Sequence, residues 1–468
     1  MSTAIHWYDP IGNIWSDTRT NTSFRVPELD GRLCFDLERR SDASTDWGQV
    51  RCGLPSAVLM PGSVTDIVKM INFCRALDIC VGTRGQAHTQ YGHSLAPGGL
   101  VISMLSLNRI QSVRSDYIRV DAGLTWRELL AGTLARGLTP PVLPYYLSLS
   151  VGGTLSVGGV SGTSYLHGAQ VDNIQDLDVI TGEGVLLSCS PSQNCELFEA
   201  VLGGLGQCAI IVSAGVRLIP APLHARIFDM VYEDLALLLA DFRVLLADER
   251  FSYVEGIVQI SKDENVTYIL EGVSFYATTP PDDSVLLDGL SYIPRSVNVQ
   301  QSSYANFCDR VAIIEAEKKA SGRWHLPHPG FDMFVPDQHA EDYIGSILGR
   351  LTFNDIPDFP CFIYGFRKDK LTRPFPRTPD TEIFFLFDVL RTTSRERTHQ
   401  AIEQNRQFYE AGCSLGGRFY PITAVPLSED DWRNHFVPYS DQLQKVRRGS
   451  DPGGILTPGP GIFTTVRG

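Results

Sequence analysis

Two glycine-bearing segments hold the residues of this chain whose types and spacing could support chemistry. The first, residues 151–162 (VGGTLSVGGVSG), has five glycines and two serines in twelve positions. Glycine permits close backbone approach, so successive N–H groups can surround an anion such as a pyrophosphate. The segment has neither the G-x-G-x-x-G order of a Rossmann turn nor the G-K-[ST] of a Walker loop. Its residues alone leave two interpretations open, a phosphate-binding loop and a tight stack of glycine-rich turns.

The second segment, residues 83–99 (TRGQAHTQYGHSLAPGG), is a polar loop between two predicted strands. Binding and catalytic residues are often found on such loops. His88 and His93 are five residues apart with no carboxylate or cysteine nearby, which is unfavourable for a metal site. His325 and His328 also lack further ligands, so we expect them to be structural or pocket-lining residues. The sequence therefore predicts no metal site.

The composition is that of a globular protein large enough for two or three domains. The chain has 468 residues, of which 43% are hydrophobic and 20% are charged. The net charge of −13 opposes binding to phosphate backbones, and no apolar run approaches the ~18 residues that a membrane span needs. The first residues lack the basic and apolar regions of a signal peptide. We expect a cytoplasmic protein with no nucleic-acid or membrane partner, whose ten scattered cysteines are mostly buried thiols.

The elements that must position the two loops alternate between strand and helix from residue 51 onward, which predicts an α/β or α+β fold. Residues 57–60 are predicted to form a strand. Ser63 is predicted to cap the helix that follows, with Asp66 completing a pattern like a capping box. Thr125 and Glu128 repeat this pattern ahead of a second helix.

Downstream of these elements the predicted pattern changes. A third helix is expected to start near Asn194, and residues 223–425 have longer strand-like stretches separated by proline-rich loops. This change predicts a second domain. Residues 426–468 are too few to fold alone, so we expect them to dock back on an earlier domain.

In combination, the two loops and their neighbours carry a known order of motifs. The order is P-G-S, R-G-x-x-H-[ST], A-P-G-G, V-G-G-T-L-S-x-x-G-x-S-G, L-D-V-[IV]-T-G and L-G-G-L-G-Q. It resembles flavoproteins of the vanillyl-alcohol oxidase superfamily and, within that superfamily, cytokinin dehydrogenases. The resemblance covers about residue 50 to the C-terminus and continues through residues 252–256, 324–329, 334–336, 390–391, 435–436 and 451–456. Each motif is weak alone, but the combination is highly specific.

The resemblance implies an α+β fold with a two-lobed, PCMH-type FAD-binding domain in residues 1–222, whose core is residues 51–222. Residues 426–468 would complete that domain, and residues 223–425 would form an α+β substrate cap. The resemblance also implies that FAD contacts both glycine-bearing segments. The cofactor-binding residues implied in this way are Arg84, Gly85, Gln86, Ala87, His88, Thr89, His93, Ser150, Gly152, Gly153, Thr154, Ser156, Gly158, Gly162, Ile211 and Pro460.

Covalent attachment of the flavin is also implied by the resemblance. His88 aligns with the histidine whose ring nitrogen is bonded to the flavin 8α carbon, and His93 is the second candidate for that bond. The family usually has Gly-His-Ser at this point, where this chain has Ala87, His88 and Thr89. The extra methyl group beside the flavin departs from the family pattern.

The position of the family's catalytic aspartate departs further. Cytokinin dehydrogenases have W-T-D-Y-L where this chain has L-P-Y-Y-L, so Tyr145 replaces the aspartate that accepts a hydrogen bond from the substrate amine. A phenol with an ordinary pKa of about 10 is a poor base at neutral pH. Glu255 occupies the family's second acidic position, and it is either a candidate base or a solvated strand residue. Pro460 stands where the family has a glutamine that borders the flavin.

These changes around a retained cofactor scaffold predict an FAD-dependent oxidoreductase with an altered substrate. We expect hydride transfer from a small amine- or alcohol-bearing metabolite to flavin N5, with Tyr145 orienting the substrate and Glu255 as the candidate base. Oxygen or a quinone is the expected electron acceptor. Two alternatives stay open: a true cytokinin dehydrogenase with a relocated base, and a non-redox binding or cyclisation scaffold on the same fold.

Overall fold

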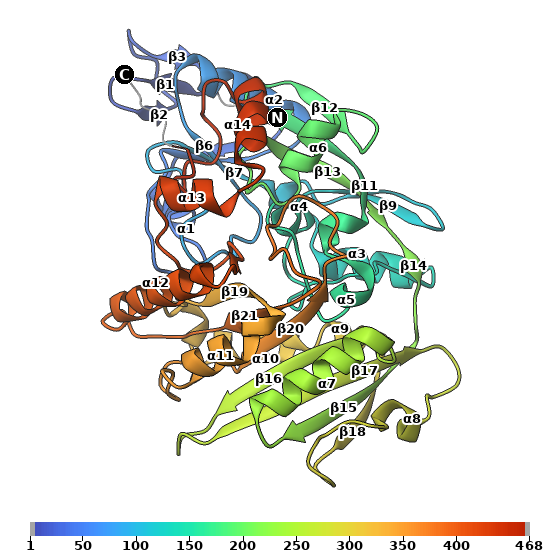
Figure 1. Ribbon diagram of the computed structural model, residues 1–468. Helices are drawn as coiled ribbons and strands as arrows, with labels where there is room; N and C mark the ends of the chain where they lie inside the picture. The colour runs from blue at the N-terminus through green and yellow to red at the C-terminus, as the bar shows by residue number, and fades with distance from the viewer. Residues whose placement is uncertain (1–4, 464–468) are drawn as a thin grey trace.

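The structure is a computed structural model that describes residues 5–463. Figure 1 shows two halves, with both ends of the chain in the upper half and most of the segments from about residue 224 to 419 in the lower half. Helices and mainly antiparallel sheets are combined in both halves. The predicted α+β class is confirmed.

Two sheets form the core of the upper half. The four-stranded sheet has the order β4 (Arg32–Cys34), β5 (Ala57–Met60), β7 (Leu100–Ser103) and β6 (Val81–Arg84), in which β4 alone is antiparallel to its neighbour. The five-stranded antiparallel sheet has the order β12 (Leu186–Cys189), β11 (Ile174–Thr181), β13 (Ala209–Arg217), β9 (Tyr117–Asp121) and β8 (Ile110–Val113). These two sheets correspond to the two expected lobes.

Smaller elements complete the upper half. Its helices are α1 (Leu37–Asp42), α2 (Val64–Ala76), α3 (Trp126–Leu134), α4 (Val151–Leu155), α5 (Ser164–His167), α6 (Cys195–Val201), α13 (Glu429–His435) and α14 (Ser440–Ser450). Its short strands are β1 (Trp7–Asp9), β2 (Ile14–Ser16), β3 (Phe24–Arg25), β10 (Leu138–Thr139) and β14 (Ile219–Pro220). Short 3-10 helices are η1 (Met104–Ser106) and η2 (Gln170–Asn173).

One eight-stranded antiparallel sheet organises the lower half, which we call the cap. Its order is β18 (Asn298–Ser303), β15 (His224–Tyr232), β17 (Val266–Tyr276), β16 (Tyr253–Ile260), β20 (Cys361–Arg367), β21 (Ile383–Val389), β19 (Phe331–Pro336) and β22 (Arg418–Phe419). The cap helices are α7 (Leu235–Asp248), α8 (Asp283–Leu287), α9 (Tyr304–Cys308), α10 (Val311–Ala320), η3 (Arg323–His325), α11 (Asp337–Leu348) and α12 (Thr398–Ser414). The strands predicted around residues 268–271 and 383–387 are confirmed as β17 and β21.

The two faces of the cap sheet have different partners because side chains alternate along a strand. Val254, Ile363 and Phe387 belong to the hydrophobic core that includes Leu238 and Phe242 of α7. Their neighbours along the same strands point to the opposite face, toward the upper half. That opposite face forms one wall of a cavity described below.

The C-terminal segment docks on the four-stranded sheet of the upper half. Leu456 forms a parallel bridge with Val81 of β6, and the Val81 N–H donates to the Ile455 carbonyl at 2.8 Å. The Asp451 carboxylate accepts from the backbone N–H groups of Ile455 and Leu456 at 3.1 and 3.0 Å. This segment is thus held against the upper half, as expected for a piece too short to fold alone.

The local signals for helices were confirmed with one correction. Thr125 and Glu128 form a complete capping box at the start of α3. Ser63 caps α2, but the Asp66 carboxylate does not complete the box, because it accepts instead from the N–H groups of Gly31 and Gly62 at 2.8 Å each. Asp66 therefore ties a distant loop to the helix, a role that its position in the sequence does not reveal.

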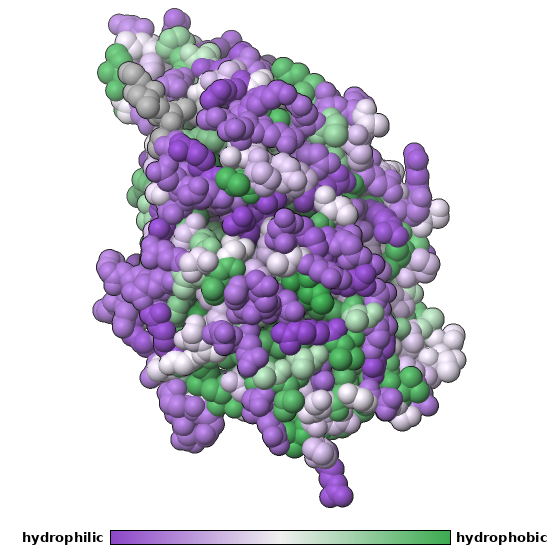
Figure 2. All heavy atoms as spheres, viewed as in Figure 1, coloured by the Kyte–Doolittle hydropathy of each residue, from purple (hydrophilic) through white to green (hydrophobic). Residues whose placement is uncertain are grey.

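The surface has the mixed character of an ordinary globular protein. On the face in Figure 2, hydrophilic residues dominate and apolar atoms appear in small scattered groups. Within residues 5–463, no helix combines the length and the apolar character needed to cross a bilayer.

Candidate functional site

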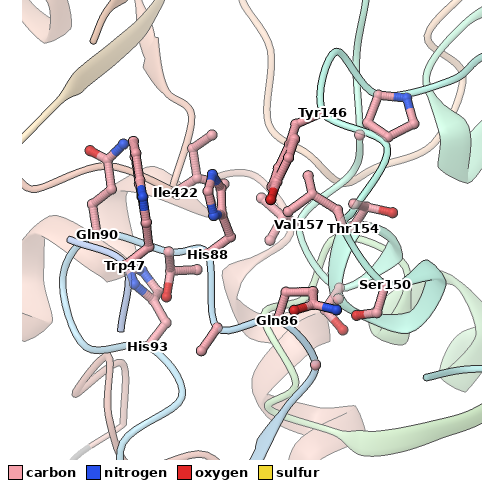
Figure 3. Close-up of a pocket in the computed structure, with 18 of the residues that line it drawn as sticks. Trp47, Gln86, His88, Gln90, His93, Tyr146, Ser150, Thr154, Val157 and Ile422 are labelled. Atoms are coloured by element: carbon pink, nitrogen blue, oxygen red, sulfur yellow. The ribbon is translucent and has the colours of Figure 1, made fainter. Parts of the chain in front are cut away.

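A cavity of about 480 Å³ lies between the two halves of the molecule. Both glycine-bearing segments line it, together with β13 and the face of the cap sheet that points away from α7. Figure 3 shows Trp47 and His88 on one side of the cavity and Tyr146 and Thr154 on the other, with Gln86 beside Ser150. Segments more than fifty positions apart in the sequence therefore share one site.

Most of the residues expected at a cofactor site line this cavity. Those that do are Arg84, Gly85, Gln86, Ala87, His88, Thr89, His93, Ser150, Gly152, Gly153, Thr154, Ser156 and Ile211, and Tyr145 also lines it. Gly158, Gly162, Pro460 and Glu255 are not among the lining residues. The two loops are brought together as expected, whereas these four residues do not line the cavity.

Packing against other segments explains three of the four. A Cβ atom on Gly158 would lie 2.6 Å from Pro376, and one on Gly162 would lie 2.7 Å from the Tyr253 ring. These glycines allow the second loop to approach the cap. The Pro460 carbonyl accepts a hydrogen bond from Trp432 Nε1 at 3.2 Å.

The wall formed by the two loops leaves no room for further side chains. A Cβ atom on Gly85 would lie 1.9 Å from Ser150 Oγ, and one on Gly153 would lie 2.8 Å from the same atom. Glycine at position 85 therefore lets the first loop lie against the Ser150 side chain, at the start of the second loop, where a larger residue would not fit.

Ala87 adopts a left-handed conformation, with φ of 49°. Within residues 5–463, the N–H groups of Ala87, His88 and Thr89 donate no hydrogen bond to the protein. Free consecutive N–H groups beside a left-handed residue form an anion-binding nest. The conformation also gives a physical reason for glycine at this position in related proteins, since a side chain at positive φ costs about 1–2 kcal/mol.

His88 lies in an aromatic stack at the cavity wall. Its ring is parallel to the Trp47 indole at 4.3 Å between centroids, and His328 stacks on Trp47 at 4.0 Å. Tyr146 lies 4.9 Å from the His88 ring. Burial, and then the neighbouring His328, lower the pKa of His88 to about 3. The imidazole is therefore neutral at physiological pH, with a free electron pair on one ring nitrogen.

His93 also faces the cavity, and neither of its ring nitrogens has a hydrogen-bond partner among the described residues. Burial lowers its pKa to about 4. The hydroxyl of Ser94, another cavity residue, is likewise buried without a partner. Buried polar atoms of this kind are normally satisfied, so they point to a polar ligand or water in this part of the cavity.

The loop that carries both histidines is anchored by Asp46, a residue that sequence analysis did not select. Asp46 Oδ2 accepts from Thr89 Oγ1 at 3.0 Å and from the Gly92 N–H at 2.6 Å. Burial raises the pKa of Asp46 to about 7. The Arg84 guanidinium donates to the carbonyl of Thr45, next to Asp46, at 3.2 Å. These contacts fix the first loop to the segment before β5.

Tyr145 packs between the second loop and the cap. Its ring lies 5.2 Å from Phe362 and under the guanidinium of Arg310, whose Cζ is 4.7 Å from the ring centroid. Burial and the nearby Glu255 raise the pKa of the Tyr145 phenol. The phenol therefore stays protonated at neutral pH and can donate a hydrogen bond but not take up a proton.

Glu255 belongs to a buried ionic cluster behind Tyr145. It is 1% exposed, so the solvated alternative does not hold. Its carboxylate accepts from Tyr253, from Tyr364 at 3.0 Å and from Arg310 at 3.1 Å. Burial raises its pKa, and Arg310 counteracts this shift. With its oxygens bonded on all sides, Glu255 positions Arg310 and Tyr364 and does not itself face the cavity.

Two further carboxyl groups do face the cavity, from neighbouring strands of the cap sheet. They belong to Asp332 of β19 and Asp388 of β21. Sequence analysis missed both. The available signal was a single acidic residue inside an otherwise apolar strand, in FDMFVP and in IFFLFDV.

Comparison with known protein families places both halves in a functional context. A model described as an FAD binding domain matches residues 55–190. A model described as "Cytokinin dehydrogenase 1, FAD and cytokinin binding" matches residues 260–463. The first match covers both glycine-bearing segments, and the second covers most of the cap together with the C-terminal segment.

Similarity to known proteins extends over almost the whole chain. An uncharacterized oxidoreductase of the fasciation locus of Rhodococcoides fascians is 35% identical over 421 residues, which is 90% of this chain and 96% of that protein. Cytokinin dehydrogenase 10 of Oryza sativa subsp. japonica is 32% identical, over 94% of this chain and 90% of its own length. Cytokinin dehydrogenase 3 of Arabidopsis thaliana is 30% identical, over 94% and 91% of the two chains.

Proposed function

This chain belongs to the cytokinin dehydrogenase family of FAD-dependent oxidoreductases, and on that basis we propose that it oxidises a small metabolite bearing an amine or an alcohol. One observation carries the proposal. A single cavity is lined by both glycine-bearing loops and by the cap, with a protonated Tyr145 where the family has its catalytic aspartate.

The residues present fit FAD. The close approach of Gly85 and Gly153 to Ser150, and the free N–H groups of residues 87–89, suit a pyrophosphate. Bound FAD would supply a hydride acceptor. The chain's own contribution is to hold that group against the cap and to exclude water from the substrate.

We propose that His88 is the site of covalent flavin attachment. Its imidazole is neutral, lines the cavity and is held in a fixed orientation between Trp47 and Tyr146. A neutral ring nitrogen is the form that can make a bond to carbon. His93 is the alternative, because both of its ring nitrogens lack a partner within the described residues.

Tyr145 orients the substrate in this proposal. Its phenol is protonated, so it offers a hydrogen bond to an amine or hydroxyl and leaves proton removal to another group. Glu255 supports it indirectly, through Arg310 over the Tyr145 ring. We propose oxygen or a quinone as the electron acceptor.

The attachment site is tested by acid precipitation of the purified protein and of His88→Ala and His93→Ala variants. We expect yellow wild-type protein whose flavin precipitates with the chain, and the same result for His93→Ala. In His88→Ala the flavin should stay in the supernatant. Covalent flavin in His88→Ala would refute the tether, and a colourless protein that does not take up FAD would refute the function.

Cytokinin is the alternative substrate, suggested by the names of the plant relatives. Anaerobic mixing separates the possibilities, because a redox substrate must bleach the flavin. We expect small amines or alcohols to bleach it faster than isopentenyladenine. Faster bleaching by isopentenyladenine would establish the alternative, and no bleaching by any of these compounds would favour a non-redox scaffold.

A further inference from the structure

The two cavity-facing aspartates lie directly opposite each other. In the antiparallel pairing of β19 and β21, the register matches Asp332 with Asp388. Directly opposed residues of antiparallel strands point to the same face of the sheet. On β20, Phe362 is the register partner of Asp388, and Phe362 contacts Tyr145. The two aspartates, which we call the Asp332–Asp388 pair, are therefore next to the wall that carries Tyr145.

The pair is buried and incompletely bonded. Asp332 is 1% exposed, and both residues line the cavity. Within residues 5–463, Oδ1 of each carboxyl group has no hydrogen-bond partner. Buried carboxyl oxygens without partners are rare, because their desolvation is uncompensated. A donor from a ligand would satisfy them.

The protein supplies no cation to this pair within the described residues. The titratable groups that act on it or feel its charge from the surrounding elements are Tyr145, Glu255, Cys361, Tyr364 and Tyr420. These groups are neutral or acidic, and Arg310 is bound to Glu255. No described side chain therefore neutralises the negative charge of the Asp332–Asp388 pair.

Two adjacent carboxyl groups in a buried site share a proton. The strand register places the two carboxyl groups side by side, so a proton on one of them relieves the repulsion between them. Burial raises the pKa of Asp388 to about 7 and, together with Asp388, raises the pKa of Asp332 well above its ordinary range. As a coupled pair they hold one proton and one negative charge above about pH 7.

We propose that the Asp332–Asp388 pair binds the cationic amino group of the substrate, so that the substrate class is alkyl- or arylalkylammonium compounds. This inference rests on the proposed function, because it assigns the polar end of the same substrate cavity. It also relocates the acidic group that is absent at Tyr145 to a different wall.

The chemistry of the cavity wall selects a cation over a neutral alcohol. An ammonium group has three N–H donors and can satisfy Oδ1 of both aspartates while neutralising the charge. A hydroxyl has one donor and leaves the charge uncompensated. The neighbouring cavity residues Phe362, Leu386 and Leu390 suit the apolar part of such a compound.

The experiment compares benzylamine with benzyl alcohol, two probes of nearly the same shape and different charge. Each is titrated anaerobically into FAD-loaded protein at pH 8 and pH 6, with affinity measured by calorimetry. At pH 8 we expect benzylamine to bind at least about tenfold more tightly. At pH 6, where the pair gains a second proton, benzylamine affinity should fall about tenfold while benzyl alcohol changes by less than about twofold.

The variants Asp388→Asn and Asp332→Asn keep the shape and remove the charge. We expect each to lose the tenfold preference for benzylamine and to retain benzyl alcohol binding. Asp430→Asn is the control, since its side chain is 81% exposed on α13, and it should behave as the wild type. If the variants do not fold, the pH dependence of the unmodified protein decides the question.

Failure of this inference is distinguishable from failure of the proposed function. Equal affinity for the two probes at pH 8, including no detectable binding of either, overturns the ammonium site, as does an unchanged preference in both variants. Flavin bleaching by any substrate would still support the oxidoreductase. Conversely, if the protein takes up no flavin but still prefers benzylamine, the ammonium site is supported and the proposed oxidoreductase function is refuted.

Discussion

Arg310 is the cation that faces two glutamates of the cap sheet, one buried and one 12% exposed. Glu255 of β16 and Glu271 of β17 are register partners, so both carboxylates point to one face. Arg310 lies 3.1 Å from Glu255 and 3.6 Å from Glu271. Burial raises the pKa of Glu271 to about 7, and Arg310 opposes that shift. The same guanidinium covers Tyr145, the residue that we propose orients the substrate.

Substitution of Arg310→Met should destabilise the protein in a pH-dependent way. Both glutamates have a native pKa above the unfolded value, so their burial costs nothing at low pH and more as pH rises. Without the Arg310 cation, the free energy of unfolding should be lower by about 3–5 kcal/mol at pH 8. Urea denaturation should show a much smaller loss at pH 5.

The matched control is Arg127→Met, because Arg127 is 40% exposed and pairs with Asp309 at the surface. This substitution should lower the free energy of unfolding by about 1 kcal/mol or less at either pH. An equal loss for Arg310→Met at pH 5 and pH 8 would contradict an electrostatic role for Arg310.

At the scale of elements, the site is made by a loop between two strands and by a segment that begins with a short helix. The first loop joins β6 to β7, and the second segment begins with α4. Asp46 anchors the first loop through Thr89 and Gly92, and the Gly85 backbone packs against the Ser150 side chain at the start of the second segment.

Replacing the anchor by Asp46→Asn should change how stability depends on pH. The native pKa of Asp46, about 7, lies above the unfolded value of 3.8, so the wild type loses stability as pH rises from 4 to 7. Asparagine removes this loss and keeps an acceptor for Thr89. In urea denaturation, the free energy of unfolding of the variant relative to the wild type should be higher at pH 7 than at pH 5. The difference should grow by at most about 1.4 kcal/mol per pH unit.

Asp263→Asn provides the control for this series, since Asp263 is exposed in a cap turn. It should follow the wild-type pH dependence. A parallel pH dependence for Asp46→Asn and the wild type would show that Asp46 is ionised in the native state.

At the scale of the whole molecule, the cavity exists because three separated parts of the chain meet. The cap sheet supplies one wall, the two lobes supply the other, and the C-terminal segment adds Thr457 to the lining. Asp451 holds that segment in place through Ile455 and Leu456. The C-terminal segment thus contributes to the site although most of the site residues lie earlier in the chain.

The substitution Asp451→Ala should loosen this closure. Two buried N–H groups would lose their acceptor, at a cost of about 1–3 kcal/mol each. We expect a lower free energy of unfolding in urea and a lower FAD content after purification. Asp441→Ala, at an exposed position of α14, should change neither measurably. Unchanged stability and FAD content in Asp451→Ala would show that the C-terminal segment does not close the site.

Sequence by itself determined the features that depend on neighbours a few residues apart. The capping box of Thr125 and Glu128 was predictable because both partners lie within one helical turn. The glycine-bearing loops and His88 were predictable because their residue types and order are themselves the signal. The role of Asp66 was not, because its acceptor atoms serve Gly31, 35 positions away.

Tertiary structure alone decided which acidic groups face the substrate cavity. Glu255 stood at the expected acidic position, yet the fold encloses it among Tyr253, Tyr364 and Arg310. Asp332 and Asp388 each stand alone in an apolar strand, and only the register of β19 with β21 brings the two together. Strand register is set by packing across the whole sheet, which is why the proposed ammonium site could not be found from the order of residues.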